Sequence, residues 1–169
     1  MIYINSLNYK EFLKKINNKY FKSKGSIENL IFAYKISKRF KISDKVIIKA
    51  INRFKGLAHR QEVVFSNKKV LCINDSKATS FDACYQSLSN YNKIYWILGG
   101  IPKYKDHFYL EKVKKNIKKA YIIGNNTLFF KKKISKKIPF VISMSMKNAV
   151  NSILKDLKLS NNSKSTILL

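Results

Sequence analysis

The sequence has only two cysteines and two histidines. Cys72 and Cys84 are expected to be free thiols, because nothing in the sequence points to an oxidising compartment. His59 and His107 have no further ligands at metal-site spacing, which excludes a zinc site. No apolar run reaches the roughly 18 to 20 residues that cross a bilayer, and the first residues do not resemble a secretory signal. We therefore expect a cytoplasmic protein without a membrane span, and a monomer.

Acidic residues and arginines are also scarce. Nine acidic residues face 35 basic ones, giving a formal charge of +26, and only Arg39, Arg53 and Arg60 are arginines. A large positive charge favours nucleic-acid binding. However, arginine is the residue suited to forked phosphate and base contacts, and here lysines are spread over every segment. We interpret the lysines as surface positions shifted by biased base composition, and a basic α/β nucleic-acid-binding module remains the alternative.

The chain is long enough for one ordinary domain and a smaller piece, at 169 residues with 46% hydrophobic residues. Residues 1–54 have a helical pattern. A short strand at 2–4 and a helix near 11–16 precede an amphipathic helix at 27–40, which places Ile27, Leu30, Ile31 and Tyr34 on one face. Ser43 can cap a second helix. Its expected inner face consists of Val46, Ile47, Ala50, Ile51 and Phe54.

Residues 55–169 alternate between strands and helices. The expected strands are 62–65, 70–73, 94–98, 120–123, 140–142 and 166–169. Three helices are expected. The first begins at Ser80, the second contains Leu110, Val113 and Ile117, and the third has an apolar stripe from Met146 to Leu157. This alternation predicts an α/β fold, with a Rossmann-like, mostly parallel sheet and helices on both faces.

Two loops follow predicted strands, and in such sheets ligands bind beyond the carboxyl ends of the strands. The first, Asp75-Ser76-Lys77-Ala78-Thr79-Ser80, opens a helix whose free N–H groups, with Lys77 and two hydroxyls, could hold a carboxylate or phosphate. The alternative is a plain helix cap. The second, Gly99-Gly100-Ile101-Pro102-Lys103, permits close backbone approach and brings Lys103 to the same edge.

A third segment, Gly56-Leu57-Ala58-His59-Arg60-Gln61-Glu62, lies where the helical and sheet patterns meet. His59 and Arg60 could reach a nucleotide held between domains. Structural roles in an ion pair or a cap are the alternative.

The order GLAHRQE, INDSKATS, WILGGIPK resembles the Mur ligase family, most closely its D-glutamate-adding member, whose pattern is G-L-P-H-R-x-E, D-S-K-A-T-N and G-G-x-x-K. The resemblance spans roughly residues 24–169. It implies that residues 1–54 are the end of a central ATP-binding domain and that residues 55–169 are a C-terminal domain that brings in the amino acid. The implied reaction joins D-glutamate to UDP-N-acetylmuramoyl-L-alanine with ATP and Mg2+, in peptidoglycan precursor synthesis.

The resemblance also implies roles for individual residues. Lys77, Thr79 and Lys103 would bind the D-glutamate carboxylates, since cations and a hydroxyl suit a dicarboxylate. His59, Arg60 and Asp75 would face the nucleotide, as would Asn29, the one residue of the family's H-N-x-x-N that is present here.

Several family features are missing from this sequence. It has no G-x-x-x-x-G-K-[ST] phosphate loop, no magnesium ligands of the central domain and no S-P-A-x-x-S-F-D segment after the final strand. Ser80 and Ala58 replace the usual Asn and Pro. We therefore expect a piece truncated at both ends that does not catalyse ligation alone, and a degenerate remnant without activity is the third possibility.

Overall fold

The computed structural model describes residues 9–18, 20–21, 23–103, 106–159 and 164–169. The chain forms two compact units, Met1–Gly56 and Leu57–Leu169, and each is described by itself. The strand expected at residues 2–4 lies outside the described residues.

The Met1–Gly56 unit contains three helices, α1 (Lys10–Lys14), α2 (Lys24–Arg39) and α3 (Asp44–Arg53). The Ser23 hydroxyl accepts a hydrogen bond from the Ser26 N–H at 3.2 Å and so caps α2. The small core of this unit is formed by Phe12, Leu30, Ile47 and Ile51. The prediction for the inner face of α3 was partly wrong, because Val46, Ala50 and Phe54 are exposed.

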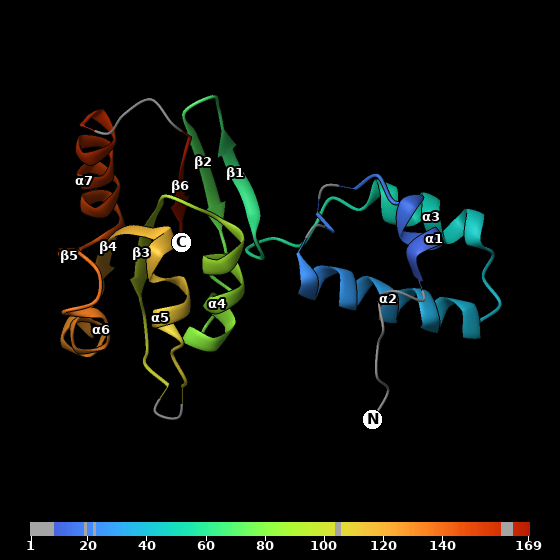
Figure 1. The fold of residues 1–169 in the computed structure, drawn as a ribbon, viewed down its shortest axis with the longest axis horizontal. Helices are drawn as coiled ribbons and strands as arrows, with labels where there is room; N and C mark the ends of the chain where they lie inside the picture. The colour runs from blue at the N-terminus through green and yellow to red at the C-terminus, as the bar shows by residue number, and fades with distance from the viewer. Residues whose placement is uncertain (1–8, 19, 22, 104–105, 160–163) are drawn as a thin grey trace. The chain divides into compact units, whose positions relative to one another are not determined.

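The Leu57–Leu169 unit is an α/β fold, as predicted (Figure 1). Its six-stranded sheet has the order β1-β2-β6-β3-β4-β5, in which β1 and β2 are antiparallel and the other neighbours are parallel. The elements, in chain order, are β1 (Glu62–Ser66), β2 (Val70–Asn74), α4 (Phe81–Asn90), β3 (Ile94–Gly99), α5 (Leu110–Val113), the 3-10 turn η2 (Lys114–Asn116), β4 (Ile117–Ile123), α6 (Thr127–Ile134), β5 (Phe140–Met144), α7 (Met146–Lys158) and β6 (Ser165–Leu168).

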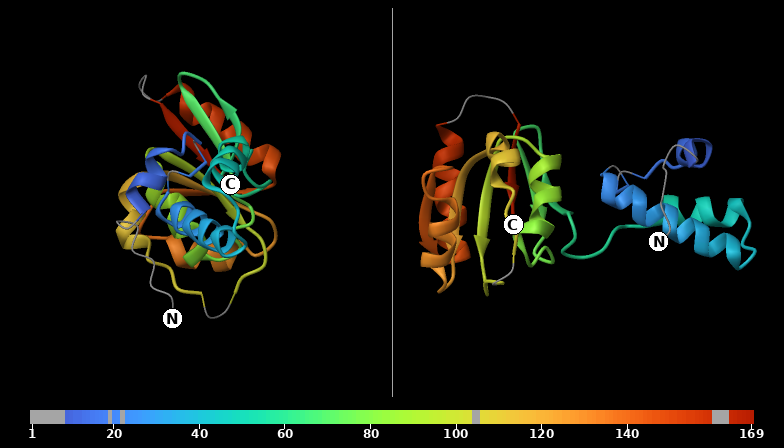
Figure 2. Two further views of the ribbon diagram at one scale, coloured as in Figure 1. Left: turned by 90° about the vertical axis from the view of Figure 1, so that its right-hand side faces the viewer. Right: turned by 60° about the horizontal axis from the view of Figure 1, so that its bottom comes forward.

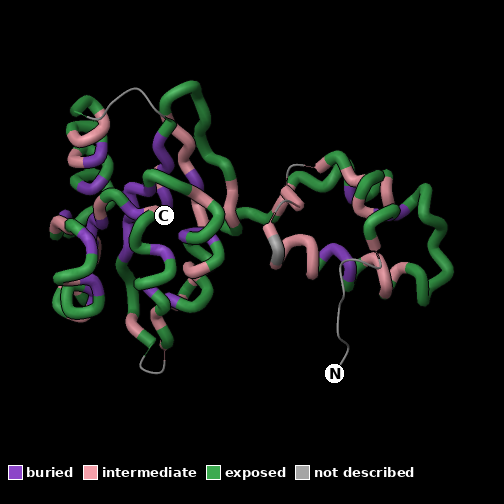
Figure 3. The backbone as a smooth tube through the Cα atoms, in the orientation of Figure 1, coloured by how far each residue is buried: buried purple, intermediate pink, exposed green. Residues whose placement is uncertain are grey.

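Helices cover both faces of this sheet (Figure 2). On one face, α4, α5 and α6 pack against alternate residues of the central strands, including Trp96 and Ile122. On the other face, Ala149 and Ile153 of α7 pack against Tyr95, Ile97 and Tyr121. The central strand β3 is buried on both faces, so its sequence is a continuous apolar run (Figure 3).

Two predictions about the middle of this unit need correction. Ile117 was expected on a helix, but it is the first residue of β4 and pairs with Ile94 across the parallel ladder. Helix α6 was not predicted at all. Its buried side consists of Phe130 and Ile134. The final strand was predicted, and the structure inserts it between β2 and β3 as β6.

No helix within the described part of the chain is both long and apolar enough to cross a membrane.

Candidate functional site

A cavity of about 580 Å³ lies where β2, β3, β4 and β6 end, at what we call the carboxyl edge of the sheet. These strands are parallel, so the loops that follow them gather at the same edge. Aromatic and aliphatic side chains form much of its wall, among them Phe81, Trp96, Leu98, Phe129 and Leu168. Such a mostly apolar pocket with a few polar groups is typical of a small-molecule site.

The two predicted loops meet in this cavity. Lys103, from the loop after β3, donates a hydrogen bond from Nζ to Thr79 Oγ1, from the loop after β2, at 3.2 Å. The two residues are 24 positions apart in the sequence, and both line the cavity. Lys103 has no carboxylate at ion-pair distance among the described residues. Its charge is therefore available to an anionic ligand.

The helix start predicted to offer free N–H groups is already occupied. Asp106 accepts hydrogen bonds from the N–H groups of Phe81 at 2.5 Å and Asp82 at 3.2 Å. Ser80 Oγ accepts the next one, from Ala83 N–H at 3.1 Å. The expectation of an open anion site at this helix was wrong, because side chains of the protein cap it. Asp106 was not predicted, since its contact joins residues about 25 positions apart.

Gly99 and Gly100 are each required for a different structural reason. A Cβ on Gly99 would lie 2.3 Å from the carbonyl oxygen of Ile123, so the close approach is to β4 and not to a ligand. Gly100 has φ +111°, in the left-handed region that favours glycine. Its carbonyl accepts a hydrogen bond from Asn126 Nδ2 at 2.9 Å, which fixes the start of the loop that carries Lys103.

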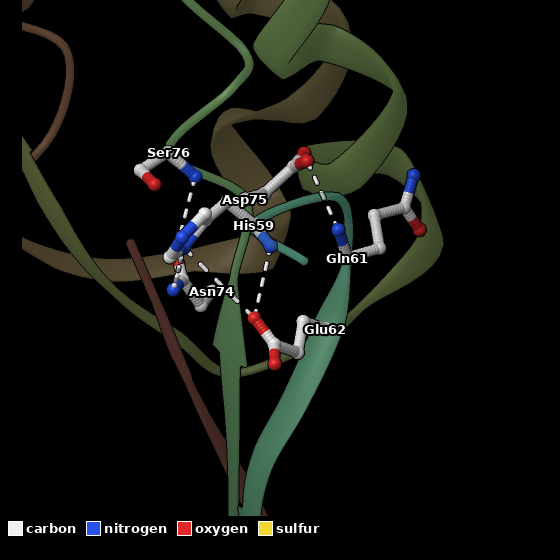
Figure 4. Close-up of polar contacts among 6 residues, drawn as sticks. All are labelled: His59, Gln61, Glu62, Asn74, Asp75 and Ser76. Atoms are coloured by element: carbon white, nitrogen blue, oxygen red, sulfur yellow. Dashed lines mark hydrogen bonds and ion pairs between the residues drawn. The ribbon is translucent and has the colours of Figure 1, made fainter. Parts of the chain in front are cut away.

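Hydrogen bonds tie the segment around His59 to the loop after β2 (Figure 4). The His59 N–H donates to Glu62 Oε2 at 2.9 Å, and its carbonyl accepts from Lys77 N–H at 3.1 Å. Its ring Nδ1 lies 2.8 Å from Asn74 Nδ2. His59 has φ 62° and Gln61 φ 47°, values uncommon outside glycine. This tightly bonded turn holds the neighbouring Arg60 beside the same edge.

Asp75 lines the cavity and is held by two donors, of which Gln61 is drawn in Figure 4. Its Oδ1 accepts from Gln61 N–H at 3.1 Å, and its Oδ2 accepts from the Ser87 hydroxyl. Burial raises the pKa of Asp75, against the lowering effects of Ser87, Gln61 and Arg60. Asp75 therefore joins Gln61 and the loop after β2 to Ser87 of α4.

Lys77 and Asn29 are not among the residues that line the cavity. The Lys77 side chain is exposed, and Lys77 is absent from the residues that line the cavity. Asn29 lies exposed on α2, in the Met1–Gly56 unit. Their binding roles remain predictions.

The remaining chemistry-bearing groups of the site are structural. Cys72 and Cys84 are free, as predicted. Burial raises the pKa of Cys84 to about 12, and its thiol donates to the Ala78 carbonyl at 3.3 Å, so it is an inert thiol. Within the described ranges, no group of three or more His, Cys, Asp or Glu side chains could hold a metal ion.

Comparisons with known proteins point to one family, although no family model matches the chain. The chain is 32% identical over 142 residues, 84% of its length, to the UDP-N-acetylmuramoylalanine--D-glutamate ligase of Wolbachia sp. subsp. Brugia malayi. It is 38% identical over 109 residues, 64% of its length, to the ligase of the same name from Rhizobium meliloti. The chain belongs to the Mur ligase family.

Solved structures agree with this Mur ligase assignment at the level of the fold. MurF from Acinetobacter baumannii has a TM-score of 0.59 at 17% identity, over 86% of this chain and 34% of that one. The UDP-N-acetylmuramate-alanine ligase MurC from Thermotoga maritima has a TM-score of 0.57 at 16% identity, over 88% of this chain and 34% of that one.

The Mur ligase chain spans only about a quarter of its curated relatives, 28% of the Wolbachia protein and 24% of the Rhizobium meliloti protein.

Proposed function

We propose that the Leu57–Leu169 unit is the amino-acid-accepting domain of an ATP-dependent ligase that joins D-glutamate to UDP-N-acetylmuramoyl-L-alanine in the cytoplasm, as a monomer. The Met1–Gly56 unit is then the end of the central ATP-binding domain. The relatives named UDP-N-acetylmuramoylalanine--D-glutamate ligase support this substrate pair.

The observation that carries the proposal is the contact between Lys103 Nζ and Thr79 Oγ1 at 3.2 Å. It places one cation without a carboxylate partner and one hydroxyl on the wall of an otherwise largely apolar cavity. A carboxylate entering there receives a charge-assisted hydrogen bond from Lys103 and a second from Thr79. Lys77, on the same loop as Thr79 and exposed, supplies the second positive charge for the other carboxylate.

Such binding contributes to amide-bond formation by holding the amino acid in one orientation. Lys103 and Thr79 lie on loops anchored to β4, α4 and α6, so a bound carboxylate is fixed relative to the sheet. Fixing the reacting amine in this way removes much of the entropic cost of bringing two substrates together.

The nucleotide side of the proposal rests on Asn29, His59, Arg60 and Asp75. ATP and Mg2+ are the cofactors of the complete enzyme in this proposal. We expect no ADP formation when the 169-residue chain is mixed with ATP and both substrates.

Titration calorimetry with D-glutamate tests the proposed site. Lys103→Ala should weaken binding at least tenfold, because a hydrogen bond to a charged group contributes about 1.5 to 3 kcal/mol and about 1.4 kcal/mol is a factor of ten. Thr79→Ser keeps a hydroxyl and should bind like the wild type.

Lys118→Ala is the matched control, since Lys118 is an exposed lysine of β4. Equal loss of binding in Lys103→Ala and Lys118→Ala would mean that only the overall charge attracts D-glutamate, and the proposal would fail.

A further inference from the structure

The loop between β3 and α5 carries Lys103 and has two anchors. At its start, the Gly100 carbonyl is held by Asn126 Nδ2 at 2.9 Å. At its other end, the Asp106 carboxylate accepts from the N–H groups of Phe81 and Asp82 at the start of α4. Lys103 lies between these two anchors in the sequence.

The second anchor is bonded to α4, the helix whose N-terminus lies close to Thr79 in the sequence. Asp106 bonds the first two N–H groups of α4, and α4 begins two residues after Thr79. Phe108, from the same loop, stacks on Phe81 with ring centroids 4.1 Å apart. The loop is thus attached to the helix by the two hydrogen bonds of Asp106 and by aromatic contacts, of which the second joins Tyr109 to Tyr85 of α4.

We propose that Asp106 is a positioning residue, which holds Lys103 within hydrogen-bonding distance of Thr79 by fastening the β3–α5 loop to the N-terminus of α4. Asp106 itself lines the cavity, but its carboxylate is engaged by the helix. The importance of this role for ligand binding rests on the proposed D-glutamate site.

The location of Asp106 on a different element from its donors distinguishes this role from ordinary capping. A helix is normally capped by the residue that precedes it, and here Ser80 already does so through Ala83 N–H. Asp106 satisfies the N–H groups of Phe81 and Asp82, which Ser80 leaves free. Because Asp106 lies on another element, the same hydrogen bonds also fasten its loop to the helix. A carboxylate near the positive end of a helix is also favourable in its own right, which makes the anchor firm.

Asp82→Ala provides the matched control for Asp106→Ala. Asp82 lies in the first turn of α4 and is exposed, so its removal deletes the same charge near the same helix end. It leaves the loop attachment intact. Asp106→Asn is the conservative variant, because its amide oxygen can still accept one of the two hydrogen bonds.

The test has a ligand-free arm and a ligand arm, both on the full chain at a temperature where circular dichroism shows every variant folded. Without ligand, nuclear Overhauser contacts between the side chains of Lys103 and Thr79 should be present in the wild type and in Asp82→Ala, and lost in Asp106→Ala. With D-glutamate, Asp106→Ala should bind about tenfold more weakly, Asp106→Asn should lie between, and Asp82→Ala should match the wild type.

The inference is overturned if the contacts between Lys103 and Thr79 persist in Asp106→Ala, or if they vanish while the affinity is unchanged. A wild-type chain that shows the contacts but binds no D-glutamate would instead contradict the proposed function, and the ligand-free arm would still decide the positioning role.

Discussion

Two aspartates line the cavity, and the protein uses both internally. Asp75 accepts from Gln61 and Ser87, and Asp106 accepts from the first turn of α4. With both carboxylates engaged, Lys103 is the charged group that the cavity wall offers to a ligand. A cavity wall with two engaged carboxylates and an available lysine suits an anionic ligand better than a cationic one.

The raised pKa of Asp75 gives a prediction about pH. A carboxyl whose pKa is raised on folding stabilises the folded state below its unfolded value, about 3.9, and this contribution is lost as the pH rises through the folded-state value. Asp75→Asn removes the titration, so its stability relative to the wild type should increase as the pH rises from about 3.5 to 7. A constant offset from the altered hydrogen bonds is expected in addition.

Urea unfolding of both proteins over this pH range measures the difference. A difference in unfolding free energy that stays flat with pH would show that Asp75 does not titrate abnormally.

At the residue scale, the sequence predicted Lys103 and Thr79 at one edge because both follow parallel strands. It could not predict Asp106, since nothing local distinguishes this aspartate from a solvent-exposed one. It also misjudged Gly99, whose tight neighbour is the Ile123 carbonyl of a strand that becomes adjacent only in the folded sheet.

At the scale of elements, one carboxylate supplements the apolar packing of α7 on β4. Asp156 Oδ2 accepts a hydrogen bond from Lys119 Nζ at 2.7 Å and another from the Tyr121 hydroxyl. Burial raises the pKa of Asp156, but these hydrogen bonds and the charge of Lys119 bring it below its ordinary value. The same contact, with burial, raises the pKa of Tyr121.

Asp156→Asn should therefore lower the unfolding free energy by about 2 kcal/mol at neutral pH, as for other hydrogen bonds to charged groups. A lowered carboxyl pKa stabilises the folded state above the unfolded value of about 3.9, and this is lost as the pH falls through the folded-state value. The difference from the wild type should thus shrink in acid.

Urea unfolding at neutral pH and at about pH 3 checks this, with exposed Lys155→Ala of α7 as the control. A wild-type stability for Asp156→Asn at neutral pH would contradict the account.

The elements themselves were largely predictable where the apolar pattern is strong. The apolar run at β3 and the helix α7 were predicted correctly, but Met146, Val150 and Leu154 of the predicted α7 stripe are exposed. Helix α6 was missed because three consecutive lysines, Lys131, Lys132 and Lys133, and an outward Leu128, 77% exposed, obscure its helical pattern. The position of β6 within the sheet depends on long-range pairing that no local pattern encodes.

At the scale of the whole molecule, the charge of +26 predicts nucleic-acid binding of a non-specific kind. Fluorescence anisotropy with short DNA duplexes should show affinity that falls on the order of a thousandfold or more between about 50 and 200 mM salt, without sequence preference. Lys103→Ala should bind DNA like Lys118→Ala. A sequence preference retained at the higher salt would favour the alternative of a nucleic-acid-binding module.

The most direct test of the D-glutamate site is a crystal structure of the chain with bound D-glutamate. We expect one carboxylate at roughly 2.7 to 3.2 Å, hydrogen-bonding distance, from both Lys103 Nζ and Thr79 Oγ1, with Asp106 still bonded to α4. Electron density for D-glutamate only at other lysines, with the cavity at the carboxyl edge left to solvent, would contradict the account.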